Sequence, residues 1–385
     1  MKVAHIITRM IVGGAQENTL STVAGLLAKG HLVLLVSGPS RGPEGSFENE
    51  IRERNIPFLV IPELVRDLNP LKDTIALIKL GLLFRRQRFD IIHTHSAKAG
   101  IIGRLAARLF SPSSKVIHTV HGLPFHPYQN CLARFLYVMA ERLVLPCTDA
   151  FIAVGEVMAG KSIRAGIGTK RDYTVIYSGF DLRPYLDAET IGAETRRKLG
   201  VSENERLLGM IGRLFPLKGH LYLLRVFARI VRNYPDVKLL LVGDGILRGE
   251  FERFVKQNGL VGRVLFAGLV PPQEIVRYAA AMDIGCHTSL REGLPRAVAQ
   301  IMAAGKPVVA FDVDGAGEIV VDGETGFLVP PEDEATLEKR ICTLLDDSEL
   351  ARRMGKSAQS RVMLKFSRET MVAEIEKLYL NILAR

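Results

Sequence analysis

The sequence contains no tryptophan, only four cysteines, and few aromatic residues of any kind, 7% of its 385 residues. The four cysteines lie far apart and form no Cys-x-x-Cys pair, which excludes a disulfide framework and a cysteine-ligated zinc site. No apolar run reaches the roughly 18 residues of a transmembrane helix, and the first residues, MKVAHIIT, do not form a signal peptide. We therefore expect reduced, structural thiols in a cytoplasmic protein.

Signatures of dinucleotide cofactors and of nucleic-acid binding are also missing. Gly13-Gly14 follows a predicted strand over residues 3–8, but it is not a Gly-x-Gly-x-x-Gly motif, and the next strand does not end in an acidic residue. A nicotinamide dehydrogenase is therefore disfavoured. The net charge is +10, of which +7 lies in residues 1–190. No aromatic-interleaved basic groove or helix-turn-helix accompanies this charge, so we expect no nucleic-acid partner; phosphorylated small molecules or anionic lipids suit it better.

Strand-like and helix-like segments alternate along the whole chain. This alternation predicts an α/β fold with parallel sheets covered by helices on both faces. A chain of 385 residues exceeds one ordinary core and suggests two domains. The pattern breaks near residue 182, so we predict domains over residues 1–182 and 183–367, followed by a last helix over 368–385.

A polar site is predicted where residues 289–309 turn from a strand into a helix. Glu292 stands just ahead of Leu294 and Pro295, and proline suits the first turn of a helix. The free N–H groups of such a helix can hold a phosphate. Gln300 would lie five residues along the helix, about 7.5 Å from its start. An ordinary strand–loop–helix connection remains the alternative.

A second loop carries cations. Gly212-Arg213 follows a predicted strand over residues 207–211, and Lys218 precedes the next helix. A guanidinium and an ammonium five residues apart can hold a diphosphate from two sides. A solvated basic loop is the alternative.

Histidines gather in the first half of the chain. His121 follows the predicted strand 116–120, at the carboxyl edge where open α/β sheets bind ligands, and this makes it a functional candidate, although a structural role is as common. We considered a metal site and predict none, because His93 and His118 lie within strands with no carboxylate spaced beside them. The histidines considered are His93, His95, His118, His121 and His126.

One helix and one loop have two interpretations each. An apolar helix over residues 75–84 ends in the cationic cluster 85–88. We interpret it as core-facing, with cations that offset the helix dipole; docking on anionic lipid headgroups is the alternative. Asp312-Val313-Asp314 resembles a metal-binding motif, but we assign it mainly to a loop.

Taken in order, these motifs resemble a retaining, nucleotide-sugar-dependent glycosyltransferase of family 4. The resemblance implies the GT-B architecture, with two Rossmann-like domains whose parallel sheets face a central cleft and a C-terminal helix that crosses back to the N-terminal, acceptor-binding domain. The motifs that carry it are Gly13-Gly14-Ala15, His121-Gly122, Gly212-Arg213, Lys218-Gly219, the run 289–295, the run 303–308 and the run 322–326.

The resemblance also implies roles for single residues. Arg213 and Lys218 would bind the donor diphosphate without a metal, and Glu292 would meet hydroxyls of the transferred sugar. His121 would hydrogen-bond a hydroxyl near the reacting end of the sugar, or the acceptor. The remaining donor-binding positions would be Gly13, Gly14, Gly212, Val270, Leu294, Pro295 and Gln300.

One position departs from the family pattern. The family has a second glutamate after seven intervening residues, and this chain has Gln300 there. The amide can accept a ribose hydroxyl but lacks the charge that strengthens such a bond. We therefore expect sugar transfer to a polysaccharide, lipopolysaccharide or lipid-linked acceptor, in the cytoplasm or at the inner face of an anionic membrane. A catalytically degenerate nucleotide-sugar-binding partner and a nucleotide-sugar epimerase stay open as alternatives.

Overall fold

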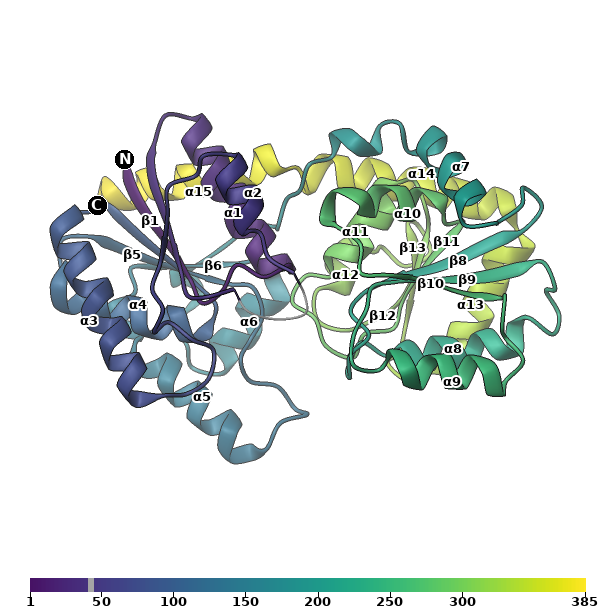
Figure 1. Cartoon of the computed structure of the whole chain (residues 1–385), viewed down its shortest axis with the longest axis horizontal. Helices are drawn as coiled ribbons and strands as arrows, with labels where there is room; N and C mark the ends of the chain where they lie inside the picture. The colour runs from purple at the N-terminus through teal and green to yellow at the C-terminus, as the bar shows by residue number, and fades with distance from the viewer. Residues whose placement is uncertain (41–44) are drawn as a thin grey trace. The chain divides into compact units, whose positions relative to one another are not determined.

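The computed structural model describes residues 1–40 and 45–385, and the chain folds into two compact units. The first unit comprises Met1–Phe180 and Arg368–Arg385, and the second comprises Asp181–Ser367 (Figure 1). Each unit contains one parallel sheet with helices on both faces, so the predicted fold class of two Rossmann-like units is confirmed.

The first unit has a seven-stranded sheet in the order β3-β2-β1-β4-β5-β6-β7. Its strands are β1 (Lys2–Ile7), β2 (Leu32–Ser37), β3 (Phe58–Val60), β4 (Ile91–His95), β5 (Lys115–Val120), β6 (Ala150–Ala153) and β7 (Tyr173–Val175). Its helices are α1 (Gly14–Ala28), α2 (Glu48–Glu53), α3 (Pro70–Gln87), α4 (Ala97–Phe110), α5 (Cys131–Leu143), η1 (Leu145–Cys147), α6 (Glu156–Arg164), η2 (Lys170–Asp172) and α15 (Arg368–Leu383).

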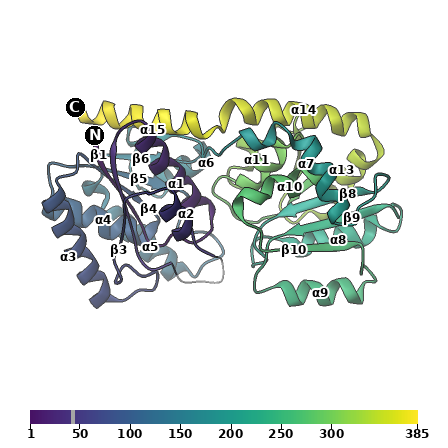
Figure 2. The same ribbon diagram turned by 45° about the horizontal axis from the view of Figure 1, so that its top comes forward.

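The two faces of this sheet bury different helices. On one face, α1 and α15 lie side by side (Figure 2) and contribute Val23 and Ile375 to the core. On the other face, α3 and α4 contribute Leu80, Phe84 and Ile102. The C-terminal helix therefore completes the core of the first unit. The core-facing interpretation of the helix over residues 75–84 is confirmed.

The second unit has a six-stranded sheet in the order β10-β9-β8-β11-β12-β13. Its strands are β8 (Arg206–Ile211), β9 (Val237–Val242), β10 (Val264–Gly268), β11 (Ile284–His287), β12 (Val308–Phe311) and β13 (Gly326–Val329). Its helices are η3 (Arg183–Tyr185), α7 (Ala188–Lys198), α8 (His220–Ile230), α9 (Arg248–Gln257), η4 (Pro272–Glu274), α10 (Ile275–Ala281), α11 (Arg296–Ala303), α12 (Ala316–Ile319), α13 (Glu334–Asp346) and α14 (Ser348–Lys365). In both ribbon views α8 and α9 cover one face and α10 and α11 the other.

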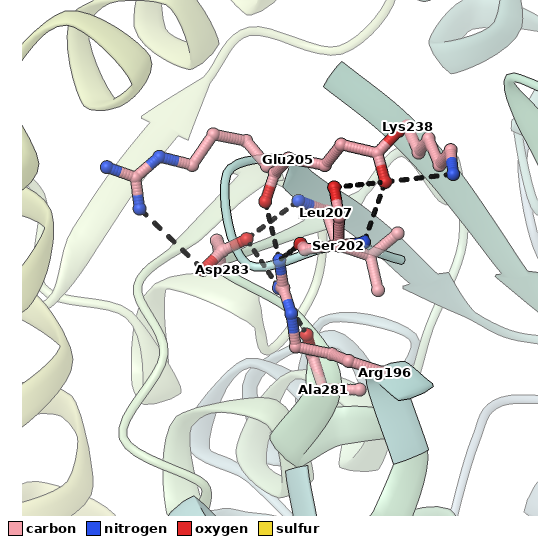
Figure 3. Close-up of polar contacts among 8 residues, drawn as sticks. Arg196, Ser202, Glu205, Leu207, Lys238, Ala281 and Asp283 are labelled. Atoms are coloured by element: carbon pink, nitrogen blue, oxygen red, sulfur yellow. Dashed lines mark hydrogen bonds and ion pairs between the residues drawn. The ribbon is translucent and has the colours of Figure 1, made fainter. Parts of the chain in front are cut away.

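Ion pairs and hydrogen bonds fasten the amino ends of these strands (Figure 3). Arg196 of α7 donates to the Asp283 carboxylate at 2.9 Å, and Asp283 also accepts from the backbone N–H of Leu207 at 2.7 Å. Lys238 lies 2.9 Å from Glu205. These groups tie α7 to β8, β9 and β11 at the amino edge of the sheet. The loops that the sequence predicts to be functional lie at the opposite, carboxyl edge.

Candidate functional site

Two loops at the carboxyl edge of the second sheet hold each other in place. The Thr288 hydroxyl, directly after β11, donates to the Gly219 carbonyl at 2.9 Å. The Leu290 N–H donates to the Leu217 carbonyl at 2.8 Å. The loop before α8 and the loop before α11 therefore form one hydrogen-bonded surface, and the structure brings together the cationic loop and the acidic loop predicted from the sequence.

Lys218 and Glu292 form the centre of this surface. The Lys218 Nζ lies 2.5 Å from Glu292 Oε1, and only 12% of the Glu292 side chain is exposed. His287 Nε2, at the end of β11, lies 3.2 Å from the same oxygen. The Glu292 N–H donates to Asp314 Oδ2 at 2.6 Å. The carboxylate is thus oriented both through its side chain and through its backbone.

This arrangement keeps Glu292 ionised. Burial alone would raise the pKa of the Glu292 carboxyl, but the Lys218 charge, the close contact with His287 and the hydrogen bond from Lys218 outweigh burial and hold that pKa well below its usual range. At neutral pH Glu292 is therefore a hydrogen-bond acceptor for hydroxyl groups. His287 and Asp314 were not predicted to belong to the site. Asp314 lies after the next strand in the sequence, and only the parallel order β11-β12 places it beside Glu292.

Gly219 shows why the cationic loop needs a glycine. Its backbone is left-handed, with φ +70°, and a Cβ added there would lie 1.9 Å from the Thr288 carbonyl oxygen. Any other residue would push the two loops apart. The Lys218-Gly219 pair therefore combines a functional cation with the turn that positions it.

Arg213 lies on the same loop as Lys218, between β8 and α8. Its side chain is exposed, and its guanidinium packs over the Phe215 ring with 5.1 Å to the centroid. Gly212 joins the loop to the sheet by donating its N–H to the Val242 carbonyl at 2.9 Å. Diphosphate binding by Arg213 and Lys218 remains a prediction.

The helix α11 begins one residue later than expected. Pro295 occupies the position before the first helical residue, with ψ 87° outside the helical range, so the expectation that Pro295 lies in the first turn is corrected. Proline restricts φ and leaves ψ free, which permits this geometry. Gln300 is the fifth residue of α11 and is buried. Leu294 precedes the helix, and Val270 is buried in the connection from β10 to η4; their predicted contacts with the donor remain predictions.

In the first unit, Gly13 and Gly14 form the start of α1. Gly13 precedes the first helical residue and its carbonyl accepts from the Glu17 N–H at 2.9 Å. A Cβ added at Gly14 would have no atom of the described residues within 4 Å. Packing therefore does not require a glycine at position 14. That glycine is present to let a ligand approach the backbone closely remains a prediction.

His121, directly after β5, is partly exposed and joins a buried group of polar side chains. Parallel pairing of β1 with β4 puts His5 opposite His93, and pairing of β4 with β5 puts His95 opposite Thr119. Tyr379 of α15 reaches the same place from the face of the sheet. His5 and Tyr379 were not predicted, because only strand register and the return of the last helix bring them to His121.

These histidines are neutral at pH 7. Burial lowers the pKa of His5 to about 3 and that of His121 to about 4. Burial, reinforced by the neighbouring histidines, holds the pKa values of His93 and His95 well below the ordinary range. A neutral imidazole carries one donor and one acceptor nitrogen, which suits a hydrogen-bond network.

The same histidines raise the question of a metal ion. One ligand nitrogen from each of His5, His93 and His95 lies within 4.8 Å of the others. Their ring nitrogens, however, face one another, Tyr379 or Thr119 at hydrogen-bond distances. This hydrogen bonding accounts for the group without an ion, and the expectation that no metal binds remains a prediction.

Helix α5 is unusual because its apolar side chains face solvent. Glu141 is the one buried residue among the described residues of α5, and it pairs with the fully buried Arg104 at 2.5 Å. Six large apolar side chains of the helix are between 37% and 73% exposed: Leu132, Phe135, Leu136, Tyr137, Met139 and Leu143. This helix was not predicted from the sequence. Within residues 1–40 and 45–385, the structure contains no helix with the length and apolarity to cross a membrane.

Two Rossmann-like units with a cation–carboxylate pair at the carboxyl edge of one sheet fit a transferase of the GT-B type, and comparison with known proteins identifies the family. The model of the Glycosyltransferase Family 4 matches residues 12–183, and the model of the Glycosyl transferases group 1 matches residues 193–361. The putative glycosyltransferase EpsD of Bacillus subtilis is 30% identical over 299 residues, covering 76% of each chain. The chain therefore belongs to glycosyltransferase family 4.

Two further proteins resemble the chain over nearly its whole length. One is the UDP-Gal:alpha-D-GlcNAc-diphosphoundecaprenol alpha-1,3-galactosyltransferase of Escherichia coli, 28% identical over 99% of this chain and 97% of that protein. The other is Anabaena HepE, solved in complex with UDP, with a TM-score of 0.81 and 26% identity over 99% of this chain and 100% of that one.

Proposed function

We propose that this glycosyltransferase moves a sugar, with retention of configuration, from a nucleoside diphosphate sugar to a lipid-linked acceptor used for polysaccharide or lipopolysaccharide synthesis. The observation that carries the proposal is the Lys218–Glu292 pair at 2.5 Å, with Glu292 held ionised at a sheet edge. Such a pair offers a cation for a leaving diphosphate and a carboxylate for sugar hydroxyls within one loop surface.

Lys218 and Glu292 can contact the diphosphate and the sugar hydroxyls at the same time. An ammonium has three donors, so Lys218 can keep its bond to Glu292 while donating to a phosphate oxygen. Its charge, together with that of Arg213, stabilises the diphosphate as negative charge develops on departure. The N–H groups at the start of α11 add donors for the same anion. The donor assignment is supported by Anabaena HepE, which was also solved with UDP-glucose.

Helix α5 favours an acceptor at a membrane surface. Its exposed apolar side chains would enter the headgroup region of a bilayer, and the exposed Arg134 on the same helix suits anionic lipid. The first half of the chain carries +7, so charge complementarity favours an anionic bilayer. The relative from Escherichia coli is named for a diphosphoundecaprenol acceptor, which supports the same acceptor class for this chain.

Transfer is tested by incubating the purified protein with a panel of nucleotide sugars and bacterial lipid extract, and by analysing the product by NMR. We expect one donor to give a glycosylated lipid whose new bond keeps the donor's anomeric configuration. An inverted product would refute retention. Binding of the nucleotide sugar in calorimetry without turnover would favour the degenerate partner, and a free epimerised sugar nucleotide would favour the epimerase.

Membrane docking is tested by flotation with vesicles that contain or lack phosphatidylglycerol. Phe135→Glu with Leu136→Glu should weaken binding to the anionic vesicles at least about tenfold, because burying each side chain contributes about 1.5–3 kcal/mol. Leu364→Glu, at an exposed leucine of α14, is the control and should bind normally. Equal binding by all three proteins would refute docking through α5.

A further inference from the structure

We infer that Tyr379 of the C-terminal helix determines, through a buried chain of histidines, whether His121 presents a bare or a protonated Nδ1 to its ligand. The inference rests on the proposed function in one respect, that His121 faces a hydroxyl of the sugar or acceptor. The positioning residues are Tyr379, His5 and His95.

The chain is continuous from the helix to the edge of the sheet. Tyr379 Oη lies 3.4 Å from His5 Nε2, and His5 Nδ1 lies 2.9 Å from His95 Nε2. His95 Nδ1 then lies 3.0 Å from His121 Nε2. On its other side, Tyr379 Oη lies 2.5 Å from His93 Nδ1.

The chain ends at Thr119. His93 Nε2 lies 2.6 Å from Thr119 Oγ1. Tyr379, His5 and His93 are fully buried and His95 is 1% exposed, so water does not compete for these bonds.

Hydrogen-bond chemistry couples the groups. A neutral histidine that donates from one nitrogen must accept at the other, so neighbouring histidines in a chain all donate in the same direction. The tyrosine has a single proton, and the nitrogen to which it is donated sets that direction for every group. Burial raises the Tyr379 pKa well above its usual value, so the phenol keeps this proton at neutral pH.

The two contacts of the Tyr379 oxygen point to one of the two directions. O–H donors make shorter bonds than N–H donors, so we assign the Tyr379 proton to the 2.5 Å contact with His93 Nδ1, and the 3.4 Å contact is the bond from His5 Nε2–H to the phenol oxygen. His93 Nε2–H then donates to Thr119 Oγ1. His5 Nδ1 then accepts from His95 Nε2–H, and His95 Nδ1 accepts from His121 Nε2–H. His121 is left with a bare Nδ1, which accepts a hydrogen bond from a hydroxyl.

The test reads the tautomers directly. In protein labelled with ¹⁵N-histidine, long-range ¹⁵N–¹H spectra at pH 7 should show His5, His93, His95 and His121 all neutral and all protonated at Nε2. This measurement needs no variant. A protonated Nδ1, or a charged ring, at any of the four would overturn the inference.

Tyr379→Phe removes only the hydroxyl that sets the direction. We expect the roughly tenfold excess of one His121 tautomer, the ratio that one hydrogen bond supports, to collapse to a mixture. Turnover should fall about twofold, in proportion to the fraction of the active tautomer, with the KM for the donor unchanged. Thr94→Val is the matched control: Thr94 is buried on β4 and its Oγ1 lies 2.9 Å from His118 Nδ1, outside the chain. It should leave the His121 tautomer unchanged.

The outcomes separate the two proposals. An unchanged His121 tautomer in folded Tyr379→Phe overturns the inference whatever the enzyme transfers. If wild-type protein transfers no sugar while the four tautomers are as stated, the proposed function fails and the tautomer chain stands.

Discussion

Lys218→Met is the substitution whose consequences the structure defines most sharply. Methionine keeps much of the apolar stem and removes the charge that lies 2.5 Å from Glu292. Breaking a buried ion pair costs about 3–5 kcal/mol. Since 25% of the Lys218 side chain is exposed, solvent screens part of this loss, and we expect the free energy of unfolding to fall by about 2 kcal/mol.

The effect on transfer should be larger than the effect on folding. Loss of a cation that stabilises a leaving diphosphate costs about 3–4 kcal/mol in the transition state, so kcat/KM should fall several hundred-fold. With the cation gone, burial dominates and the pKa of the Glu292 carboxyl should rise. The carboxylate then becomes a weaker acceptor at mildly acid pH.

The assay combines urea unfolding with initial rates on the donor found in the transfer screen. Adding Glu292→Gln to Lys218→Met should restore part of the lost stability, because no carboxylate is left unpaired, while transfer remains low. Lys238→Met is the matched control. Lys238 also pairs with a glutamate, Glu205, at 2.9 Å, but at the amino edge of the same sheet; it should lower stability and leave kcat/KM within about twofold. Near-normal kcat/KM for Lys218→Met, or an equal loss for Lys238→Met, would refute the assigned role.

Three further predictions concern the nucleotide, the loop and acid stability. Gln300→Glu should tighten UDP binding about tenfold in calorimetry if this position accepts a ribose hydroxyl, because charged acceptors form stronger hydrogen bonds; unchanged affinity would contradict that contact. Gly219→Ala should lower the free energy of unfolding by about 3 kcal/mol through left-handed strain and overlap with the facing carbonyl, whereas Gly200→Ala, at φ +67° with open space around it, should cost only about 1 kcal/mol. Stability should fall as the pH drops below about 6.5, because the unfolded chain then binds protons that the buried His5 and the partly exposed His121 exclude in the folded state, by up to about 1.4 kcal/mol per pH unit for each such histidine; a flat urea midpoint between pH 6.5 and 5 would contradict the prediction that both rings stay neutral.

Strands and helix ends were predicted correctly where the apolar pattern and the turn residues indicate the same element. The apolar runs of β8, β9 and β12 form buried strands as expected, and Gly305, with φ +74°, ends α11 where predicted. Short or partly exposed elements were missed, including β3 and α5. In α5 the apolar residues face solvent, so hydrophobic periodicity carries no information about its core contacts.

Lys218 and Glu292 were predicted from their own loops, because a cation before a glycine turn and a carboxylate before a helix are local patterns. That they touch was decided by tertiary structure: the pairing of β8 with β11 brings the two loops to one edge. The residues that orient Glu292 were likewise not predicted, because the sequence indicated only that His287 ends a strand and that Asp314 belongs to a loop.

The sequence by itself determined the alternation of strands and helices, the glycine turns and the chemical types of the site residues, because these depend on neighbours a few positions apart. Tertiary structure alone decided which of those residues meet. Strand register placed His5 opposite His93, and the return of α15 set Tyr379 against both, 374 residues along the chain from His5. Burial then made these rings neutral, and a neutral, hydrogen-bonded chain is a property that no single segment of the sequence contains.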